Sequence, residues 1–443
     1  MIPQIASAHA VAKYELERRI LERSAAVEHW FRGEWQQITP PFYASVDLRN
    51  SGFKIAPVDT NLFPGGFNNL SPSVQPLCVQ AVMTAIDRIC PEARNLLLVP
   101  ENHTRNLFYL KNVARLSTII RQAGLNVRIG TLNPEIVAPT LIDVPDDGSL
   151  ILEPITRKGQ RVVLPPFDGG GGIPRLGPFD PCTILLNNDL SSGLPDILKD
   201  ASTQYVLPPL HAGWAVRRKS HHFAAYDAVT AEFAQLLEID PWLINPYFAR
   251  CGQVNFHERT GEECLASNVA ALLDRIRVKY QEYGIADEPY VVVKADAGTY
   301  GMGIMMAKSP EDVRGLNRKQ RNKMAVVKEG LEVHDVIIQE GVHTHEKADD
   351  SVAEPVVYMI DRYVVGGFYR VHNARGIDEN LNAPGMHFVP LAFEECCTTP
   401  DYFAGPLATA NRFYAYGVVA RLALAAAGRE LEETAPAEQS APA

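Results

Sequence analysis

The chain has 443 residues, of which 46% are hydrophobic and 21% charged, and its formal net charge is −10. This length exceeds one ordinary core and predicts about two or three domains. The acidic balance without a basic block argues against nucleic acid as the main partner, and no apolar run reaches the roughly 18 residues of a membrane span. Seven cysteines without metal-ligand spacing indicate a reduced, cytoplasmic chain.

The predicted elements of the first half begin with a charged amphipathic helix at 13–23, which lacks the pattern of a signal peptide. Two strands follow, Phe42–Leu48 and Phe53–Pro57, and the turn-like residues Arg49–Gly52 join them as a hairpin. From Val74 helices and strands alternate, which is typical of an α/β unit. The alternating elements are helix Val74–Ile89, strand Asn95–Val99, helix Leu107–Ala123, strand Asn126–Gly130, and strands Ser149–Ile155, Arg161–Leu164 and Thr183–Asn187.

The second half is also mixed. Its predicted elements are helices Tyr226–Leu237 and Ser267–Tyr283, strand Tyr290–Val293, a helical stretch Glu311–Val326, strands Asp335–Gln339, Val356–Ile360 and Arg362–Gly367, and a final helix Ala408–Ala427. The last residues, 429–443, are mostly Ala, Pro, Glu and Gln without periodicity. Such a composition predicts a disordered tail.

The most informative segment is Pro289–Gly303, where a strand of β-branched residues ends at Lys294 and a glycine-rich loop follows. Glycine lets backbone approach phosphate closely, and the lysine supplies a point charge. We therefore predict a triphosphate-binding site formed by Lys294 with Gly298, Thr299, Tyr300, Gly301 and Gly303. The chain has neither a P-loop nor a dinucleotide-binding glycine motif. A hairpin with a glycine turn is the structural alternative.

Val336–Val342 is an apolar strand that ends in Gln-Glu-Gly-Val. Backbone groups of Gln339, Glu340 and Val342 are expected to pair with the edge of adenine, and the Glu340 carboxylate to accept from the ribose hydroxyls. His343 and His345 follow at once. A zinc site needs further ligands that the sequence does not offer, so solvent exposure is favoured for both histidines.

Downstream, a strand ends in Gly-Gly-Phe-Tyr-Arg370, and an Asn-Leu-Asn-Ala-Pro-Gly loop contains Asn380 and Asn382. In this order, the strand lysine, glycine loop, Gln-Glu-Gly-Val segment, arginine strand and asparagine loop resemble the ATP-grasp fold of glutathione synthetases and peptide ligases. The resemblance implies ATP and Mg²⁺ as cofactors, a catalytic role for Arg370 on the charge of an acyl phosphate, and phosphate contacts for Asn380 and Asn382. A surface ion pair is the alternative for Arg370, and an ordinary loop role is the alternative for the asparagines.

One part of that pattern is missing downstream. ATP-grasp enzymes end with acidic strand residues that hold magnesium, and no such pair follows Gly385. Asp47 and Asp59-x-Asn61 in the N-terminal hairpin are similar to the missing motif, and Mg²⁺ prefers such hard oxygen ligands. We therefore expect a circularly permuted catalytic core in which Asp47, Asp59 and Asn61 bind the metal. Shaping of turns is the alternative role for these residues.

Over its whole length the chain resembles the proteobacterial glutamate–cysteine ligases of the ATP-grasp-like kind, the gamma-glutamylcysteine synthetases. The strings that carry this resemblance are 59–69, 100–106, 213–220 and 294–303. It implies ATP-dependent joining of the γ-carboxyl of glutamate to the amine of cysteine, the first step of glutathione biosynthesis. Another carboxylate–amine ligase, a kinase on the same fold and a scaffold that binds ATP without turnover are the alternatives.

Lys219 lies about where ATP-grasp lids carry a first phosphate lysine, although Arg217 and Arg218 are equally good anion ligands. Substrate-binding roles are expected for His103, Arg105 and Asn106, because loops after the strands of α/β sheets bind ligands. A structural salt bridge is the alternative for Arg105. Arg49 and Lys54, on the metal hairpin, are the remaining candidates for a substrate carboxylate.

The expected fold is therefore α/β (α+β), with an ATP-grasp-like core and an inserted α/β substrate domain. The boundaries are a helix and metal hairpin at 1–70, the substrate domain at 71–210, a lid at 211–340, the catalytic domain at 341–428 and the tail at 429–443. The expected partners are ATP, glutamate and cysteine, without nucleic acid or membrane. Assembly into a homo-oligomer and the order of binding stay open.

Overall fold

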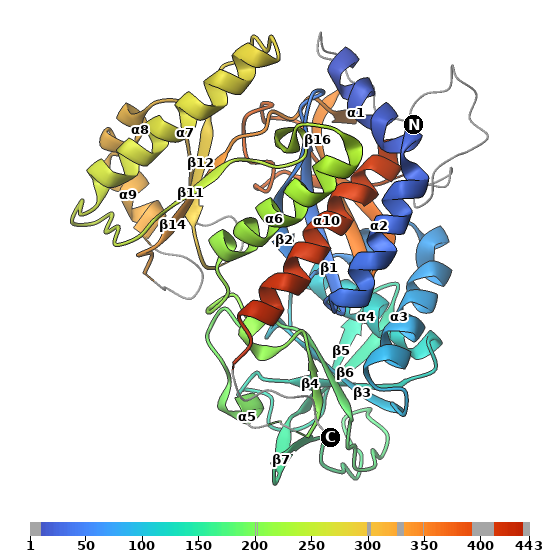
Figure 1. Ribbon diagram of the computed structural model, residues 1–443. Coiled ribbons are helices and arrows are strands. Elements are labelled where there is room, and N and C mark those ends of the chain that lie inside the picture. Colours follow the sequence, from blue (N-terminus) through green and yellow to red (C-terminus); the bar gives the residue numbers. More distant parts are fainter. Residues whose placement is uncertain are drawn as a thin grey trace.

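The computed structural model describes residues 10–199, 201, 203–298, 303–325, 332–348, 350–391 and 412–436. These residues form two six-stranded sheets, one four-stranded sheet and a two-stranded ribbon, with helices packed around them (Figure 1). The mixed α/β architecture expected from the sequence is confirmed. No helix in the described ranges combines the length and apolarity needed to cross a bilayer.

The central sheet joins the two ends of the chain. Its strands are β1 (Tyr43–Asn50), β2 (Ile55–Asn61), β16 (Ser351–Ile360), β17 (Tyr363–His372) and β18 (His387–Pro390), in the order β18-β17-β16-β1-β2, with β15 (Lys347–Ala348) beside β16. Strand β1 pairs antiparallel with β16, and Asp47 lies directly opposite Asp59 on β2. The predicted N-terminal hairpin is thus a neighbour of the strand hairpin that ends near Arg370.

Both faces of the central sheet are covered. One face packs against α10 (Arg412–Glu433) and α6 (Lys219–Leu237), with α1 (Ala10–Glu22) and α2 (Ser24–Gln37) alongside, and the other packs against α3 (Gln75–Ile89) (Figure 1). Alternate side chains of β1 point to opposite faces. Ala44, Val46 and Leu48 therefore join the core under α10 and α6, whereas Tyr43 joins the core with α3.

A mostly parallel sheet forms the lower part of Figure 1. Its order is β10 (Tyr205–Leu207), β9 (Thr183–Asn187), β3 (Asn95–Pro100), β4 (Asn126–Thr131), β6 (Gly148–Pro154) and β5 (Thr140–Val144), where only β5 is antiparallel. Helix α4 (Leu107–Gln122) packs beside it, α5 (Asp196–Lys199) precedes β10, and β7 (Thr156–Lys158) with β8 (Arg161–Val163) makes the ribbon. The carboxyl ends of β3 and β9 lie side by side, as Pro100 pairs with Asn187.

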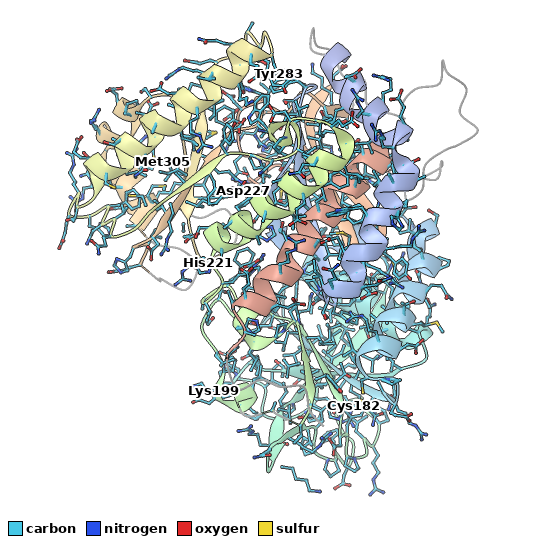
Figure 2. The ribbon with its side chains drawn as sticks, in the orientation of Figure 1. Cys182, Lys199, His221, Asp227, Tyr283 and Met305 are labelled. Carbon is cyan, nitrogen blue, oxygen red and sulfur yellow. The ribbon has the colours of Figure 1, made fainter. Side chains whose placement is uncertain are left out.

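A small sheet carries the predicted lysine strand. Its order is β11 (Phe248–Cys251), β14 (Val336–Glu340), β12 (Val291–Ala295) and β13 (Ile304–Ala307), and all pairs are antiparallel. One face packs on α7 (Glu262–Glu282), α8 (Pro310–Arg314) and α9 (Arg318–Ala325). Side chains fill this layer in Figure 2, where Met305 and Tyr283 both pack against its core. The opposite face bears Val292 and Lys294 and borders a cavity.

The short 3₁₀ turns are η1 (Phe67–Asn69), η2 (Pro72–Val74), η3 (Leu210–Ala212) and η4 (Pro241–Leu243). The predicted helical stretch at 311–326 is two helices, because the chain breaks at Gly315. The tail predicted from 429 is wrong at its start, since α10 runs to Glu433. Glu430 is buried there and accepts two hydrogen bonds of 2.8 Å from Arg217, so its charge is compensated inside the protein. Residues 437–443 lie outside the described ranges.

Candidate active site

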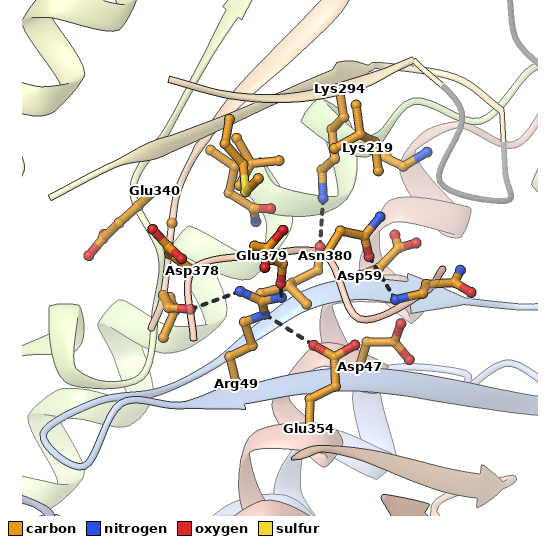
Figure 3. Close-up of a pocket in the computed structure, with 18 of the residues that line it drawn as sticks. Asp47, Arg49, Asp59, Lys219, Lys294, Glu340, Glu354, Asp378, Glu379 and Asn380 are labelled. Atoms are coloured by element: carbon orange, nitrogen blue, oxygen red, sulfur yellow. Dashed lines mark hydrogen bonds and ion pairs between the residues drawn. The ribbon is translucent and has the colours of Figure 1, made fainter. Parts of the chain in front are cut away.

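A first cavity of about 900 Å³ lies between the small sheet and the central sheet. Figure 3 shows Lys219 and Lys294 at one side of it, with Asp47, Asp59 and Glu354 on the central strands. The residues that line it are Asp47, Arg49, Val58, Asp59, Lys219, Tyr290, Val292, Lys294, Ala295, Ala297, Gly298, Ile304, Met306, Gln339, Glu340, Gly341, Val342, Glu354, Arg370, Asp378, Glu379, Asn380 and Asn382. Segments from both ends and the middle of the chain therefore meet at one cavity.

Two buried lysines face this cavity. The Lys294 ammonium donates to the carbonyl oxygen of Val58 at 2.6 Å, and the Lys219 ammonium donates to that of Gly298 at 2.6 Å. Within the described part of the chain, neither lysine forms an ion pair with a carboxylate. Burial lowers the pKa of both, that of Lys219 to about 8. Each ammonium is thus held in place away from solvent, with Asp59 close enough to interact but not paired with it.

The two aspartates opposite the lysines differ in their electrostatics. Burial alone would raise the pKa of Asp59, but Lys219 and Lys294 lower it below its ordinary value. The pKa of Asp47 is raised above its ordinary value, because the effect of burial outweighs the attraction of Arg370. Asp59 is therefore the more firmly ionised of this cross-strand pair.

Arg370 and Glu354 form the other end of the cavity. Arg370 Nη1 donates to Glu354 at 2.7 Å and to Asp47 at 3.0 Å, while Arg49 Nε donates to the second oxygen of Glu354 at 3.1 Å. The Arg370 side chain is only 12% exposed, so a surface ion pair is wrong as its explanation. Sequence reasoning missed Glu354, although a single carboxylate inside the apolar strand Ser351–Ile360 is a usable signal.

Arg49 lines the same cavity, but its donors already have protein partners. Besides Glu354, they reach the Tyr290 hydroxyl at 3.0 Å, the Val342 carbonyl at 3.2 Å and the Glu379 carbonyl at 2.5 Å. The guanidinium therefore ties the hairpin to the small sheet and to the asparagine loop. A contact of Arg49 with a substrate carboxylate stays a prediction.

The predicted ribose contact of Glu340 stays a prediction, and its carboxylate already has protein partners. Its carboxylate forms a buried ion pair with Lys54 at 2.9 Å, and accepts from Trp242 Nε1 at 3.0 Å and from the Tyr247 N–H at 2.9 Å. In Figure 3 it turns away from Lys294 and Asp59. The ion pair with Lys54 compensates a carboxylate charge that would otherwise be isolated at this depth.

Other predicted positions are only partly described. Gly298 and Gly303 have φ values of +90° and +62°, the backbone that glycine favours, and Gly298 lines the first cavity. Thr299, Tyr300 and Gly301 lie outside the described residues. The exposure predicted for the histidine pair is wrong for His343, which is buried with its ring edge-on to Tyr290 at 5.0 Å. Burial also lowers its pKa to about 4.

A second cavity of about 1410 Å³ lies between the central sheet and the parallel sheet. It shares Asp47, Asp59, Arg370 and Asn382 with the first cavity. Residues at or just after the carboxyl ends of β3 and β9 line it, where open α/β sheets bind ligands. These residues are Glu101, His103, Asn106, Asn187 and Asp189.

Two of the three residues that were predicted to bind substrate after β3 line this cavity, and the third does not. His103 and Asn106 line it, and Asn106 also caps α4 by accepting from the Tyr109 N–H at 3.2 Å. Arg105 is exposed and borders neither cavity. Asn382 borders both, and its own N–H donates to the Asn380 side chain at 2.9 Å. The four shared residues define a junction where molecules in the two cavities can meet.

The junction suits a magnesium ion that arrives with phosphate. In the described part of the chain, no three His, Cys, Asp or Glu side chains are grouped so as to hold a metal by themselves. Nucleotide sites, however, give Mg²⁺ only one or two carboxylates, and phosphates and water complete the shell. Asp47, Asp59 and Asn61 are hard oxygen donors at or beside the junction. Asn61 also shapes a turn, since its side chain accepts from the Phe63 N–H at 2.9 Å.

Comparison with known proteins decides the family. The family model described as Glutamate-cysteine ligase matches residues 17–431. The chain belongs to the glutamate–cysteine ligase family. It is thus an enzyme of the carbon–nitrogen ligase class, and the predicted family resemblance is confirmed.

One solved structure agrees with this family. A crystal structure from Methylobacillus flagellatus KT, provisionally named gamma-glutamylcysteine synthetase, is 62% identical, covers 98% of this chain and 99% of its own, and has a TM-score of 0.89. A glutathione synthetase-like effector from Globodera pallida is 9% identical over 82% of this chain and 78% of its own, and its TM-score of 0.34 carries no argument. No curated protein matches the chain.

Proposed function

We propose that this ligase uses ATP and Mg²⁺ to convert the γ-carboxylate of glutamate into an acyl phosphate, which the amine of cysteine then captures. In this proposal it catalyses the first step of glutathione biosynthesis, in the cytoplasm. The observation that carries the proposal is the pair of buried lysines, Lys219 and Lys294, which have no ion-pair partner in the described residues and face Asp59.

The lysines support a triphosphate in the first cavity. A buried ammonium loses its contacts with water. A bound phosphate replaces them with an opposite charge and hydrogen bonds. Apolar side chains of the small sheet, Val292, Ile304 and Met306, border the same cavity. A flat apolar wall with convergent polar groups at one end is the usual form of a nucleotide pocket. The base then lies along the small sheet and the phosphates extend toward the junction.

The chemistry belongs at the junction of the two cavities. A γ-carboxylate in the second cavity attacks the terminal phosphorus of ATP in the first, and ADP leaves. The cysteine amine, having lost its proton, then attacks the acyl carbon, and inorganic phosphate leaves with the C–O bonding pair. Arg370 stabilises the negative charge of the acyl phosphate and of the species formed when the amine attacks it. Asp47, Asp59 and Asn61 would hold Mg²⁺, which screens the phosphate charges when bound.

The second cavity binds the two amino-acid substrates. Both substrates carry an α-ammonium group, and Glu101 and Asp189 give the lining a matching negative charge. The side chains of His103 and Asn106 add groups that can donate or accept hydrogen bonds. The strand order supports a permuted ATP-grasp-like core, because metal strands from the N-terminus pair directly with the Glu354 strand. That permutation is part of the proposal.

Trapping of the acyl phosphate tests the proposal. The protein is supplied with ATP, magnesium and glutamate, and hydroxylamine replaces cysteine. We expect γ-glutamyl hydroxamate and an equal amount of ADP, and both should vanish in Asp59→Asn. Hydroxamate that forms without ATP consumption, or ADP release without hydroxamate while ATP is bound, rules the acyl phosphate out.

A further inference from the structure

Gln339 is a polar exception on the cavity face of the small sheet. Alternation places Val292, Ile304 and Met306 toward the first cavity, while Val293 and Ile338 join the core under α7. Gln339 pairs with Val292 across the strands and borders the cavity with it. It is the residue of this apolar wall that carries an uncharged amide.

The Gln339 side chain is buried without a hydrogen-bond partner for its donor. The residue is 2% exposed, and its Nε2 atom contacts no acceptor in the described structure. Buried polar atoms are nearly always paired, so each exception calls for an explanation. An unpaired amide beside a cavity is explained by a ligand that supplies the missing partner.

The neighbouring carboxylate cannot take this role. Glu340 is committed to Lys54, Trp242 and the Tyr247 N–H. The backbone N–H groups next to it are also used, since Glu340 donates to the Tyr247 carbonyl at 2.7 Å and Gly341 to the Tyr290 carbonyl at 2.8 Å. Of the two polar side chains at the end of this strand, that of Gln339 is therefore the one left to read a base.

We propose that the amide of Gln339 reads the purine of the bound nucleotide and selects adenine over guanine. Its Nε2 donates to N7 of the base, and its Oε1 accepts from the exocyclic N6 amino group. Gln pairs with adenine in this way on the same base edge in DNA. Guanine presents two acceptors there, N7 and O6, so either rotation of the amide leaves one acceptor facing another.

This inference rests on the proposed use of ATP and adds the base selectivity. The test is calorimetric binding of ADP, GDP and 7-deaza-ADP, which lacks the N7 acceptor, to the full chain. The wild type should bind ADP at least about tenfold more tightly than GDP, and 7-deaza-ADP more weakly than ADP. In Gln339→Met, which keeps the side-chain length, both preferences should shrink by about tenfold. Met305→Leu, a volume-conserving change at the neighbouring residue that packs against the other face of this sheet, should keep them.

The outcomes separate two failures. If the wild type binds ADP but Gln339→Met keeps the full preference for ADP over GDP, the base-reading role is wrong and the proposed function stands. If the wild type binds neither diphosphate, both fall together. Should Gln339→Met fail to fold, the wild-type comparison decides alone: equal affinities for ADP and 7-deaza-ADP overturn the contact with N7.

Discussion

The two ends of the first cavity handle positive charge in opposite ways. At the lysine end, the hydrogen bonds of Lys219 and Lys294 within the described residues go to backbone carbonyls, and burial lowers the pKa of both. At the arginine end, Arg370 lies between Glu354 and Asp47. The lysine end is therefore prepared for an incoming anion, whereas the arginine end is already compensated. The proposed phosphate binding and the proposed chemistry thus lie at separate ends of one cavity.

The largest expected effect is at the arginine end. Arg370→Ala should lower kcat/KM by roughly 10²–10³-fold, as removal of one donor to a developing negative charge does. ADP release under saturating ATP measures it, and thermal unfolding of the variant checks the fold. Arg362→Ala, at an exposed arginine just before the same strand, is the matched control. A loss below about threefold would remove Arg370 from the chemistry.

The lysine end should control affinity instead. Lys219→Met and Lys294→Met should each weaken ADP binding by about 10–100-fold, since hydrogen bonds to charged groups contribute about 1.5–3 kcal/mol. Titration calorimetry gives the affinities. Lys158→Met should change nothing, because Lys158 is exposed on the ribbon strand β7 and borders neither cavity. Unchanged ADP affinity in both cavity variants would contradict the contrast between the ends.

The pH dependence sharpens the same contrast. Only the protonated ammonium attracts phosphate, and burial sets the pKa of Lys219 to about 8 in the free protein. ADP affinity should therefore be level below about pH 8 and fall above it, by up to about tenfold per pH unit. Lys219→Met should flatten this fall between pH 8 and 9.5. A variant that keeps the full wild-type slope would assign the titration to another group.

The smallest effect is expected at a residue that the sequence placed in the substrate site. Arg105→Ala should leave the KM values for glutamate and cysteine within about twofold, because Arg105 is exposed and borders neither cavity. His103→Ala, two residues away and on the second cavity, should raise one of them. Steady-state kinetics with each amino acid varied in turn compares the pair. A tenfold rise for Arg105→Ala would move a substrate carboxylate outside the second cavity.

The sequence predicts those parts of the site that local patterns determine. Lys294 lies next to the last residue of an apolar strand before a glycine loop, and Asp47 and Asp59 face each other because a short hairpin connects their strands. Glu354 was within reach by the same reasoning, since it pairs directly with Arg370 across the β16–β17 hairpin.

Contacts between distant segments were beyond such patterns. Glu340 looks like a ribose ligand until the hairpin brings Lys54 against it. Glu430 looks like part of a solvated tail until Arg217, 213 residues earlier, reaches it. In both cases a buried ion pair formed by tertiary packing decides the role of the carboxylate, and no local rule encodes the partner.

Transfer of labelled oxygen tests the central claim most directly, namely that the glutamate γ-carboxylate attacks ATP at the junction. Glutamate labelled with ¹⁸O in its γ-carboxyl is turned over with ATP, magnesium and cysteine, and the released phosphate is weighed by mass spectrometry. We predict that each phosphate gains a single ¹⁸O atom from the carboxylate. Phosphate without label, formed while γ-glutamylcysteine accumulates, would contradict the account.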